Sequence, residues 1–353
     1  MSERVKVLVT GVAGATIGEQ VCKALRQGVN GYEFVICNSH AAGMQVIAAD
    51  HYEIVPPAVD PSYLERLIEI CERYAVQFVI PGSDPELWAL AKSGHFPDRR
   101  GTRLLANSIA VIDICSNKSV TFTHLQEKGF LTPETFLVER VDALDLLPGR
   151  YPWVIKPPAG GSGSSNVFIA QDRQELELFT TYLLKSGYAA LVQEYIGTVE
   201  DEYTVGVVHY PDGSLAGSIA IRRQISGGLS NRLKVPNRTG NLQLGSLLAI
   251  SSGITQGEVG DFPLVRRRAE AVASALGSRG PLNIQGRWNG REFVPFEINP
   301  RFSGTEPLRA MVGFNAPEAL INWFRSDGHQ HPQMTATRSG IFTRGISDYF
   351  SAK

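Results

Sequence analysis

The sequence has few cysteines, and their spacing suggests neither a metal site nor a disulfide framework. Four cysteines are scattered over 353 residues, and no pair has the C-x-x-C spacing that is typical of structural zinc sites. Isolated cysteines of this kind are usually reduced residues that pack in a core. We therefore expect no disulfide and no zinc site.

The sequence also lacks a long apolar run and an excess of charge of one sign. No stretch approaches 18 apolar residues, and the N-terminal MSERVKVLVTG runs straight into a strand pattern without the apolar segment of a signal peptide. Lys and Arg total 34 against 35 Asp and Glu, for a formal net charge of -1, which gives no electrostatic reason to bind nucleic acid or an anionic membrane. We expect a cytoplasmic protein with no nucleic-acid or membrane partner.

The order of strand and helix signals divides the chain into three parts. Residues 1–110 alternate apolar strand runs such as VKVLVT with segments of helical spacing, a rhythm that predicts a parallel sheet with helices on both faces. Residues 111–330 are richer in strands joined by turns such as PDGS (211–214) and WNGR (288–291), which favour antiparallel sheets. The fold class is therefore α/β followed by α+β, and residues 331–353 are predicted to form a C-terminal tail.

One stretch within the second part has an unusual composition. Residues 222–260 are dense in Gly, Ser, Asn and Arg and are too long for an ordinary connection between strands. This composition predicts a mobile loop at an active site.

The first glycine-rich segment, TGVAGATIG, lies at a strand-to-helix turn. Its glycines, Gly11, Gly14 and Gly18, are spaced G-x-x-G-x-x-x-G and not G-x-G-x-x-G, and the following strand, FVICNSH, offers no Asp or Glu for a ribose diol. A nicotinamide cofactor is therefore a minor alternative. We expect these glycines to let the helix pack closely on the sheet.

A second glycine-rich segment, WVIKPPAGGSGSSNVFIA, predicts two strands joined by a Gly/Ser loop. Glycines allow backbone N–H groups to approach phosphate oxygens, and Lys156 on the first strand supplies a positive charge to the same phosphates. A flexible turn without a ligand remains the alternative. The candidate phosphate-binding residues are Lys156, Gly161, Ser162, Gly163 and Ser164.

Two carboxylates flank a short apolar connection downstream, in LVQEYIG and EYTVGVV. An adenine base needs backbone hydrogen bonds in an apolar slot, and its ribose needs a carboxylate acceptor. Glu194, Tyr195, Ile196 and Glu202 could provide both.

The segment VPFEINPRFSG places polar groups at every second position of an apolar run. In an extended chain Glu297, Asn299 and Arg301 share one face, whereas Phe296 and Ile298 should point to the other face, into a core. One face of this strand is therefore built to hold a charged ligand.

A neighbouring antiparallel strand, LNIQGRW, would add Gln285 to that face. Carboxylate and amide oxygens suit a hard ion that keeps waters and shares phosphate oxygens. Gln285, Glu297 and Asn299 are thus candidate ligands for magnesium or manganese.

Taken together, these motifs resemble the ATP-grasp superfamily, in the branch that looks like one half of the carbamoyl-phosphate synthetase large subunit. The resemblance implies a preATP-grasp domain over residues 1–110 and a two-subdomain ATP-grasp fold with antiparallel sheets over 111–330. It implies that Lys118, in SNKSVTF, and Lys156 contact the phosphates, with Gly161–Ser164 as a flexible phosphate loop. Glu194 to Ile196 then correspond to the adenine contacts and Glu202 to the ribose carboxylate.

The resemblance also implies roles for the polar strand face and for nearby cations. Gln285, Glu297 and Asn299 match the metal ligands, and Arg301 matches an arginine that steadies the transferring phosphoryl group or the substrate anion. Arg223 and Lys234 are further candidates for the substrate carboxylate or the γ-phosphate, with plain surface charge as the alternative.

The activity expected from this resemblance is that of an ATP-dependent carboxylate-amine ligase. ATP with magnesium would activate a small-molecule or peptide carboxylate as an acylphosphate, an amine would attack it, and ADP and phosphate would leave. A homodimer is possible. The chain contains a single ATP-grasp unit, so the alternatives are an ATP-grasp kinase, a bicarbonate-activating enzyme, or a nucleotide-binding protein without activity.

Overall fold

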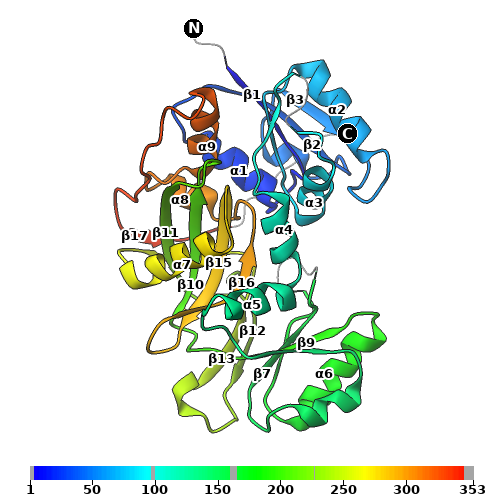
Figure 1. The fold of residues 1–353 in the computed structure, drawn as a ribbon, viewed down its shortest axis with the longest axis vertical. Helices are drawn as coiled ribbons and strands as arrows, with labels where there is room; N and C mark the ends of the chain where they lie inside the picture. The colour runs from blue at the N-terminus through cyan, green and yellow to red at the C-terminus, as the bar shows by residue number, and fades with distance from the viewer. Residues whose placement is uncertain (1–3, 97–99, 160–164, 226, 346–353) are drawn as a thin grey trace.

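The computed structural model describes residues 4–96, 100–159, 165–225 and 227–345, and it begins with a five-stranded sheet (Figure 1). The strand order is β3-β2-β1-β4-β5, and every neighbouring pair is parallel. This confirms the predicted parallel sheet. The strands are β1 (Val5–Val9), β2 (Tyr32–Asn38), β3 (His51–Ile54), β4 (Phe78–Ile80) and β5 (Arg103–Leu104).

Helices cover both faces of this sheet. On one face α2 (Tyr63–Tyr74) and α3 (Asp84–Lys92) pack over a buried core. On the other face α1 (Ile17–Leu25) begins after Thr16, whose side chain accepts a hydrogen bond from the Glu19 N–H. A Cβ on Gly18 would lie 2.4 Å from the Thr10 carbonyl oxygen, so only glycine allows this close approach, and the packing interpretation of the first glycine segment is confirmed.

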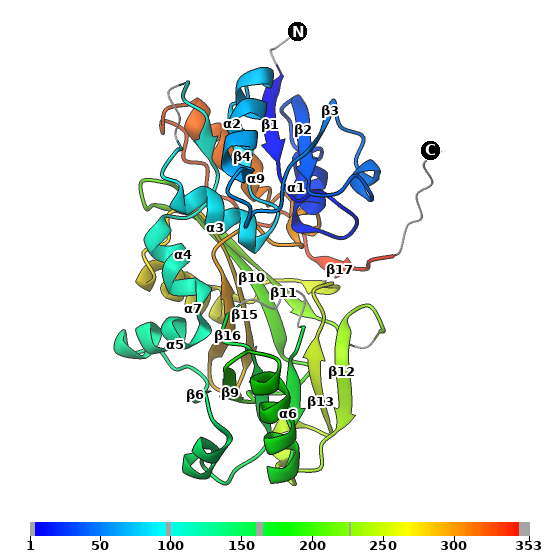
Figure 2. The same ribbon diagram turned by 90° about the vertical axis from the view of Figure 1, so that its right-hand side faces the viewer.

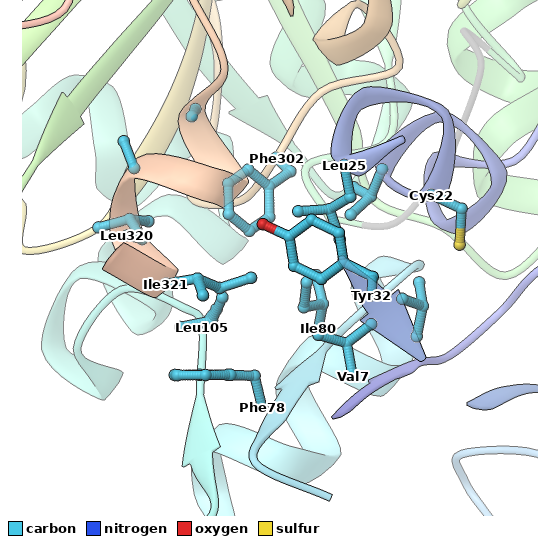
Figure 3. Close-up of a cluster of buried hydrophobic side chains, with 14 of the residues drawn as sticks. Val7, Cys22, Leu25, Tyr32, Phe78, Ile80, Leu105, Phe302, Leu320 and Ile321 are labelled. Atoms are coloured by element: carbon cyan, nitrogen blue, oxygen red, sulfur yellow. The ribbon is translucent and has the colours of Figure 1, made fainter. Parts of the chain in front are cut away.

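A helix from the other end of the chain completes this second face. In α9 (Ala316–Arg325), Leu320 and Ile321 pack with Leu25 of α1 and with residues of the sheet (Figure 3). The buried Glu318 side chain accepts hydrogen bonds from the backbone N–H groups of Val29 (2.8 Å) and Asn30 (3.0 Å). The core of the N-terminal sheet therefore includes residues more than 200 positions downstream.

Two helices, α4 (Ile109–Ser116) and α5 (Lys118–Glu127), lead to a four-stranded antiparallel sheet of order β6-β9-β7-β8. Helix α6 (Arg173–Lys185) packs against it, burying Leu176 and Leu183 beside Trp153. The strands are β6 (Thr135–Val138), β7 (Trp153–Lys156), β8 (Phe168–Ala170) and β9 (Ala190–Glu194).

A six-stranded sheet of order β16-β15-β10-β11-β14-β17 follows. Its strands pair antiparallel, the predicted PDGS and WNGR turns join β10 to β11 and β15 to β16, and α7 (Pro263–Ala275) covers one face. The antiparallel part of the fold prediction is thus confirmed. The strands are β10 (Glu202–His209), β11 (Leu215–Arg223), β14 (Gly257–Val259), β15 (Pro281–Trp288), β16 (Phe293–Asn299) and β17 (Gly340–Phe342).

The prediction of one long loop over residues 222–260 is wrong. β12 (Asn231–Pro236) and β13 (Leu247–Ser251) form an antiparallel pair beside the four-stranded sheet (Figure 2), and β14 follows. Leu233 and Val235 alternate with polar residues and pack against Leu248 and Ile250. Polar residues on the outer face of β12 hid this alternation in the sequence.

The predicted C-terminal tail also contributes to the sheet. Met334 forms an isolated bridge with Gly217, and β17 pairs with β14 as the edge strand. Figure 2 shows β17 running beneath α1. The short α8 (Glu306–Ala310) follows β16, and the 3-10 helices are Met44–Val46, Val141–Leu146 and Leu242–Leu244.

Two expectations about the whole chain can be compared with the fold. All four cysteine side chains are buried, as expected for packing residues. Over the part of the chain that is described, no helix has both the length and the apolar surface required to span a bilayer.

Candidate active site

A pocket of about 730 Å³, partly open to solvent, lies where the four-stranded sheet, the β12–β13 hairpin and the six-stranded sheet meet. The predicted residues Gly161, Ser162, Gly163 and Ser164 lie outside the described residues, although Ser165 lines the pocket. Eight predicted residues also line it: Lys118, Lys156, Glu194, Tyr195, Ile196, Glu202, Gln285 and Glu297.

Two lysines supply positive charge to one side of the pocket. Lys156 on β7 is 6% exposed, and its Nζ donates to Gln193 Oε1 (2.7 Å) and to the Phe296 carbonyl (3.1 Å). Burial and, to a smaller extent, the nearby Lys118 ammonium lower the pKa of Lys156 to about 7, and Glu297 opposes the change. A phosphate group here would favour the charged form of Lys156.

Lys118 is fixed by the start of α5. The Asn117 side chain caps this helix by accepting from the Ser119 N–H (2.9 Å), and the Lys118 N–H donates to the Pro158 carbonyl (2.9 Å). The second bond ties the helix to the chain that leaves β7. Both lysines are therefore carried by rigid elements at the same end of the pocket.

The adenine segment predicted at residues 194–196 forms the apolar end of the pocket. The Tyr195 hydroxyl accepts from the Ala249 N–H (2.9 Å) and donates to the Ala249 carbonyl (3.2 Å), which joins β9 to β13. Ile196 and Ile250 line the same pocket. Glu194 accepts from the Glu134 N–H (3.1 Å), and burial raises the pKa of its carboxyl group.

Glu202, the predicted ribose carboxylate, is fully buried between two arginines. Its Oε2 accepts from Arg287 Nε (3.0 Å) and Nη2 (2.8 Å), and Arg223 Nη1 lies 3.3 Å from Oε1. A buried carboxylate without such partners would be strongly destabilising. Glu202 lines the pocket. Its contact with a ribose stays a prediction.

Sequence reasoning missed Arg287. Its guanidinium lies 4.4 Å from the Tyr195 ring centroid and donates to the Ala249 carbonyl (2.8 Å), so it joins Glu202 to the adenine segment. The signal was present, because Arg287 follows Gln285 by two residues on the same strand and therefore shares its face.

The residues predicted to bind metal share one face of the β15–β16 pair, called the metal face below, and their metal role stays a prediction. Gln285 lies directly opposite Glu297, and Asn283 lies opposite Asn299. Gln285 Nε2 donates to Glu297 Oε2 (3.4 Å), while its Oε1 accepts from Arg223 Nη1 (3.0 Å). Asn299 shares this face but does not line the pocket.

These residues fit a hard cation that also binds phosphate. Across residues 4–345, apart from the gaps stated above, no group of three or more His, Cys, Asp and Glu side chains converges. One carboxylate, on Glu297, and two amide oxygens would leave several coordination positions for phosphate oxygens and water, as magnesium prefers.

The prediction that Phe296 points into the core is wrong. The pairing of β15 with β16 shifts between Gln285 and Gly286, which leaves Phe296 as the extra residue of a β-bulge. Phe296 therefore lines the pocket, and the Arg287 guanidinium lies 5.9 Å from its ring centroid. Ile298, which is 5% exposed, does lie in the core beneath α7.

Arg301 follows β16 and contacts the N-terminal domain instead of lining the pocket. Its Nε donates to Asp84 Oδ1 (2.8 Å) at the start of α3, and its Nη1 donates to the Phe302 carbonyl (3.2 Å). Arg301 lowers the pKa of Asp84, and Lys118 adds to this effect. Asp84 was not predicted, because SDPELW indicates a helix start and nothing more.

The two remaining predicted cations lie elsewhere. Arg223 is 4% exposed and donates to Ser251 Oγ (2.9 Å) and to Gln285 Oε1, so it supports the metal face from outside the pocket. Lys234 lies on the exposed face of β12 and does not line the pocket. The structure does not bring Lys234 together with the other candidates.

Comparison with known protein families gives two matches that follow one another along the chain. A family described as "PylC-like, N-terminal domain" matches residues 8–105, and a family described as "ATP-grasp domain" matches residues 115–305.

Among curated proteins, this chain is similar to carbamoyl phosphate synthase large chains. That of Thermoplasma volcanium is 24% identical over 327 residues, which cover 86% of this chain and 29% of that protein. That of Methanocorpusculum labreanum is 24% identical over 301 residues, covering 82% and 26%. The chain thus spans less than a third of the length of these relatives.

Solved structures share the fold. An L-amino acid ligase from Bacillus licheniformis has a TM-score of 0.63 at 15% identity, covering 92% of this chain and 74% of that one. An N5-carboxyaminoimidazole synthetase from Staphylococcus aureus complexed with ADP has a TM-score of 0.64 at 12% identity, covering 95% and 80%. A D-alanine–D-alanine ligase from Bacillus anthracis complexed with ATP has a TM-score of 0.57 at 16% identity, covering 93% and 100%.

Proposed function

The chain belongs to the ATP-grasp family, whose domain model matches more than half of its residues, and we propose that it is an ADP-forming carboxylate-amine ligase. The observation that carries this proposal is one pocket in which Lys118 and Lys156 lie near Glu297, with an apolar end at Tyr195 and Ile196. Positive charge, a cation ligand and an apolar slot are what a nucleoside triphosphate requires.

The arrangement suggests how ATP would lie. The adenine would occupy the apolar end near Ile196 and Ile250, the ribose would lie toward Glu202, and the phosphates would lie toward the two lysines. Glu297, Asn299 and Gln285 would hold magnesium or manganese, which neutralises phosphate charge and orients the terminal phosphoryl group. Lys118, Lys156, Glu194 to Ile196 and Glu202 are thus the proposed nucleotide contacts.

The proposed reaction transfers the γ-phosphoryl group to a substrate carboxylate. A carboxylate oxygen forms a bond to phosphorus as the bond to the bridging oxygen of ADP breaks, and an amine then displaces phosphate from the acylphosphate. The protein positions the reacting groups and supplies positive charge that stabilises the transferring phosphoryl group. Lys156 becomes charged against the phosphates, and Arg301, which lies near Lys118 through Asp84, would neutralise the transferring group once it releases Asp84.

The acid and the amine belong to the proposal only as chemical classes. Because the chain spans less than a third of the carbamoyl phosphate synthase large chains, their reaction is not carried over to it. A small-molecule or peptide carboxylate with an amine acceptor remains the proposed pair, and a homodimer stays a prediction. A kinase would use the same pocket and differ in its stable product.

The products distinguish these possibilities. We expect ADP and phosphate in a screen of carboxylates and amines, and slow ATP hydrolysis when the acid is omitted, since the acid must be present before the phosphoryl group leaves. Hydroxylamine should trap a hydroxamate from the correct acid. AMP as the stoichiometric product would refute the acylphosphate route, and a stable phosphorylated alcohol would identify a kinase.

Nucleotide binding can be tested without knowing the substrates. ATP with magnesium at a hundred times its Kd should stabilise the protein by about 2.7 kcal/mol, measured as a rise in Tm. NADH should have no effect, because Gly18 of the first segment packs against the Thr10 carbonyl and Gly11 packs against the Glu86 side chain. A rise with NADH and none with ATP would reverse the assignment of the two glycine-rich segments.

A further inference from the structure

An arginine near the C-terminus reaches the boundary between the N-terminal domain and the metal strand. Arg344 lies two residues beyond β17, and its Nη1 donates to Gln20 Oε1 (3.1 Å) in the first turn of α1. Its Nη2 donates to the carbonyl of Gly304, and its backbone N–H to Gln256 Oε1 (3.4 Å). Arg344 thus connects three separate parts of the fold.

The charge of Arg344 is poorly compensated by its surroundings. The acceptors of its side chain are a neutral amide and a carbonyl, and its buried Nε has no hydrogen-bond partner within the described ranges. Burial lowers the pKa of Arg344, and Glu19 opposes this effect. The Glu19 carboxylate is itself engaged by Lys23 (2.6 Å) and by the Ala15 N–H (2.6 Å).

The position of Arg344 in the fold is one where ligands commonly bind. The order β3-β2-β1-β4-β5 makes the chain turn in opposite directions after β1 and β4, and open α/β sheets bind ligands at the carboxyl ends of such strands. The chain after β1 leads to Gln20, and the chain after β4 leads to Asp84. Arg344 contacts the first and Arg301 the second.

The electrostatics of this edge favour an anion. The amino ends of α1 and α3 carry partial positive charge, and two guanidinium groups are added to them. Asp84 neutralises Arg301, whereas the contacts of Arg344 are neutral. A carboxylate bound to Arg344 would compensate this charge through two charge-assisted hydrogen bonds.

We propose that Arg344 binds a substrate carboxylate other than the one that is phosphorylated, an inference that rests on the ligase function proposed above. Arg344 does not line the ATP pocket, but it holds Gly304 of the loop that follows the metal strand and carries Arg301. The substrate class is therefore either a dicarboxylic acid as donor or an amino acid as the amine acceptor.

The test is a comparison of kinetic constants for a substrate pair found by ADP release. Arg344→Ala should raise the KM of one substrate by about 10- to 100-fold, the usual effect of losing a hydrogen-bonded charge pair, and leave the KM of ATP unchanged. A raised KM for the acid identifies a dicarboxylic donor, and a raised KM for the amine identifies an amino acid acceptor. Arg344→Lys should restore part of the loss.

Arg338→Ala is the matched control. Arg338 lies on the same segment, is exposed, and donates to the backbone carbonyl of Met311, so its loss should leave every KM unchanged. If Arg344 only stabilised the fold, Arg344→Ala would lower the Tm and would lower kcat with all substrates alike. Arg344→Lys would then not restore the KM of one substrate in particular. That result would overturn the proposal.

A substrate analogue makes the test direct. Replacing the second carboxylate by a carboxamide should weaken binding to the wild type by about 10- to 100-fold and cause no further loss in Arg344→Ala. If the loss of affinity caused by the carboxamide and that caused by Arg344→Ala added in full, the second carboxylate and Arg344 would not be in contact. The proposed contact would then be refuted.

The failure of this proposal differs from the failure of the ligase function. If no pair releases ADP, calorimetry with succinate, glutarate and the protein amino acids, each paired with its carboxamide, still measures carboxylate binding to the wild type and to Arg344→Ala. Equal binding by both proteins, or no binding by either, would overturn the role of Arg344. If Arg344→Ala weakened the binding of the carboxylates and not that of the carboxamides, the role of Arg344 would be supported, even if the reaction products proved to be AMP and pyrophosphate.

Discussion

Glu297→Ala should lower kcat for ADP formation by roughly 100- to 1,000-fold, the scale seen when one group that stabilises a charged transition state is lost. Glu297 supplies the single carboxylate of the proposed metal face, opposite Gln285, and it lies at a pocket instead of in a core. Denaturant unfolding should therefore remain close to wild type. Wild-type rates for Glu297→Ala at saturating magnesium would contradict the ligand role.

The adjacent residue provides the control for fold. Ile298 is 5% exposed and packs beneath α7, so Ile298→Ala should lower the free energy of unfolding by about 2–5 kcal/mol. Its folded fraction should keep the wild-type KM for ATP. Phe296→Ala, by contrast, should now act on nucleotide affinity, because the bulge turns Phe296 to the pocket.

Lys156→Met should abolish turnover and change how stability depends on pH. The pKa of Lys156 falls from 10.5 to about 7 on folding because burial disfavours the charge, so protonation opposes folding. The wild type therefore loses stability as pH falls from about 10.5 to 7, at up to about 1.4 kcal/mol per pH unit, and the loss levels off below about 7. The Lys156→Met variant lacks this dependence of stability on pH.

The measurement is denaturant unfolding of both proteins between pH 9 and pH 6. The variant should gain on the wild type by about 2 kcal/mol between pH 9 and 7, and the difference should then level off. Lys185→Met, at the exposed end of α6, is the matched control for the loss of one lysine side chain. A constant difference between Lys156→Met and the wild type over the whole range would mean that Lys156 stays charged in the folded protein.

The elements that could be predicted from sequence are those with clear periodicity and turn residues. The parallel N-terminal sheet and the β10–β11 and β15–β16 hairpins lie where their patterns indicate. The alternation of side chains along a strand gave a wrong prediction where one extra residue is inserted in a β-bulge. Alternation along β16 assigns Phe296 to the core, and the bulge opposite Gly286 reverses it, because a bulge depends on pairing with a partner strand that one segment does not reveal.

Site residues could be predicted from the sequence where their role depends on their position along a strand. Lys156, Glu202, Gln285 and Glu297 all line the pocket. Charge partners could not be found, because they depend on packing between distant segments: Arg287 and Arg223 flank Glu202, and Asp84 meets Arg301 across more than 200 residues. Lys234 was chosen from local composition, and composition does not say which face of β12 it occupies.

The placement of α9 on the N-terminal sheet has a consequence for synthesis on the ribosome. The sheet of residues 5–104 leaves the exit tunnel first, but the apolar surface that receives Leu320 and Ile321 remains uncovered until α9 emerges, more than 200 residues later. Contacts so distant in sequence form slowly, since a long loop must close first. The nascent N-terminal domain should therefore need a chaperone to shield that surface, and it should complete its folding only after α9 has left the ribosome.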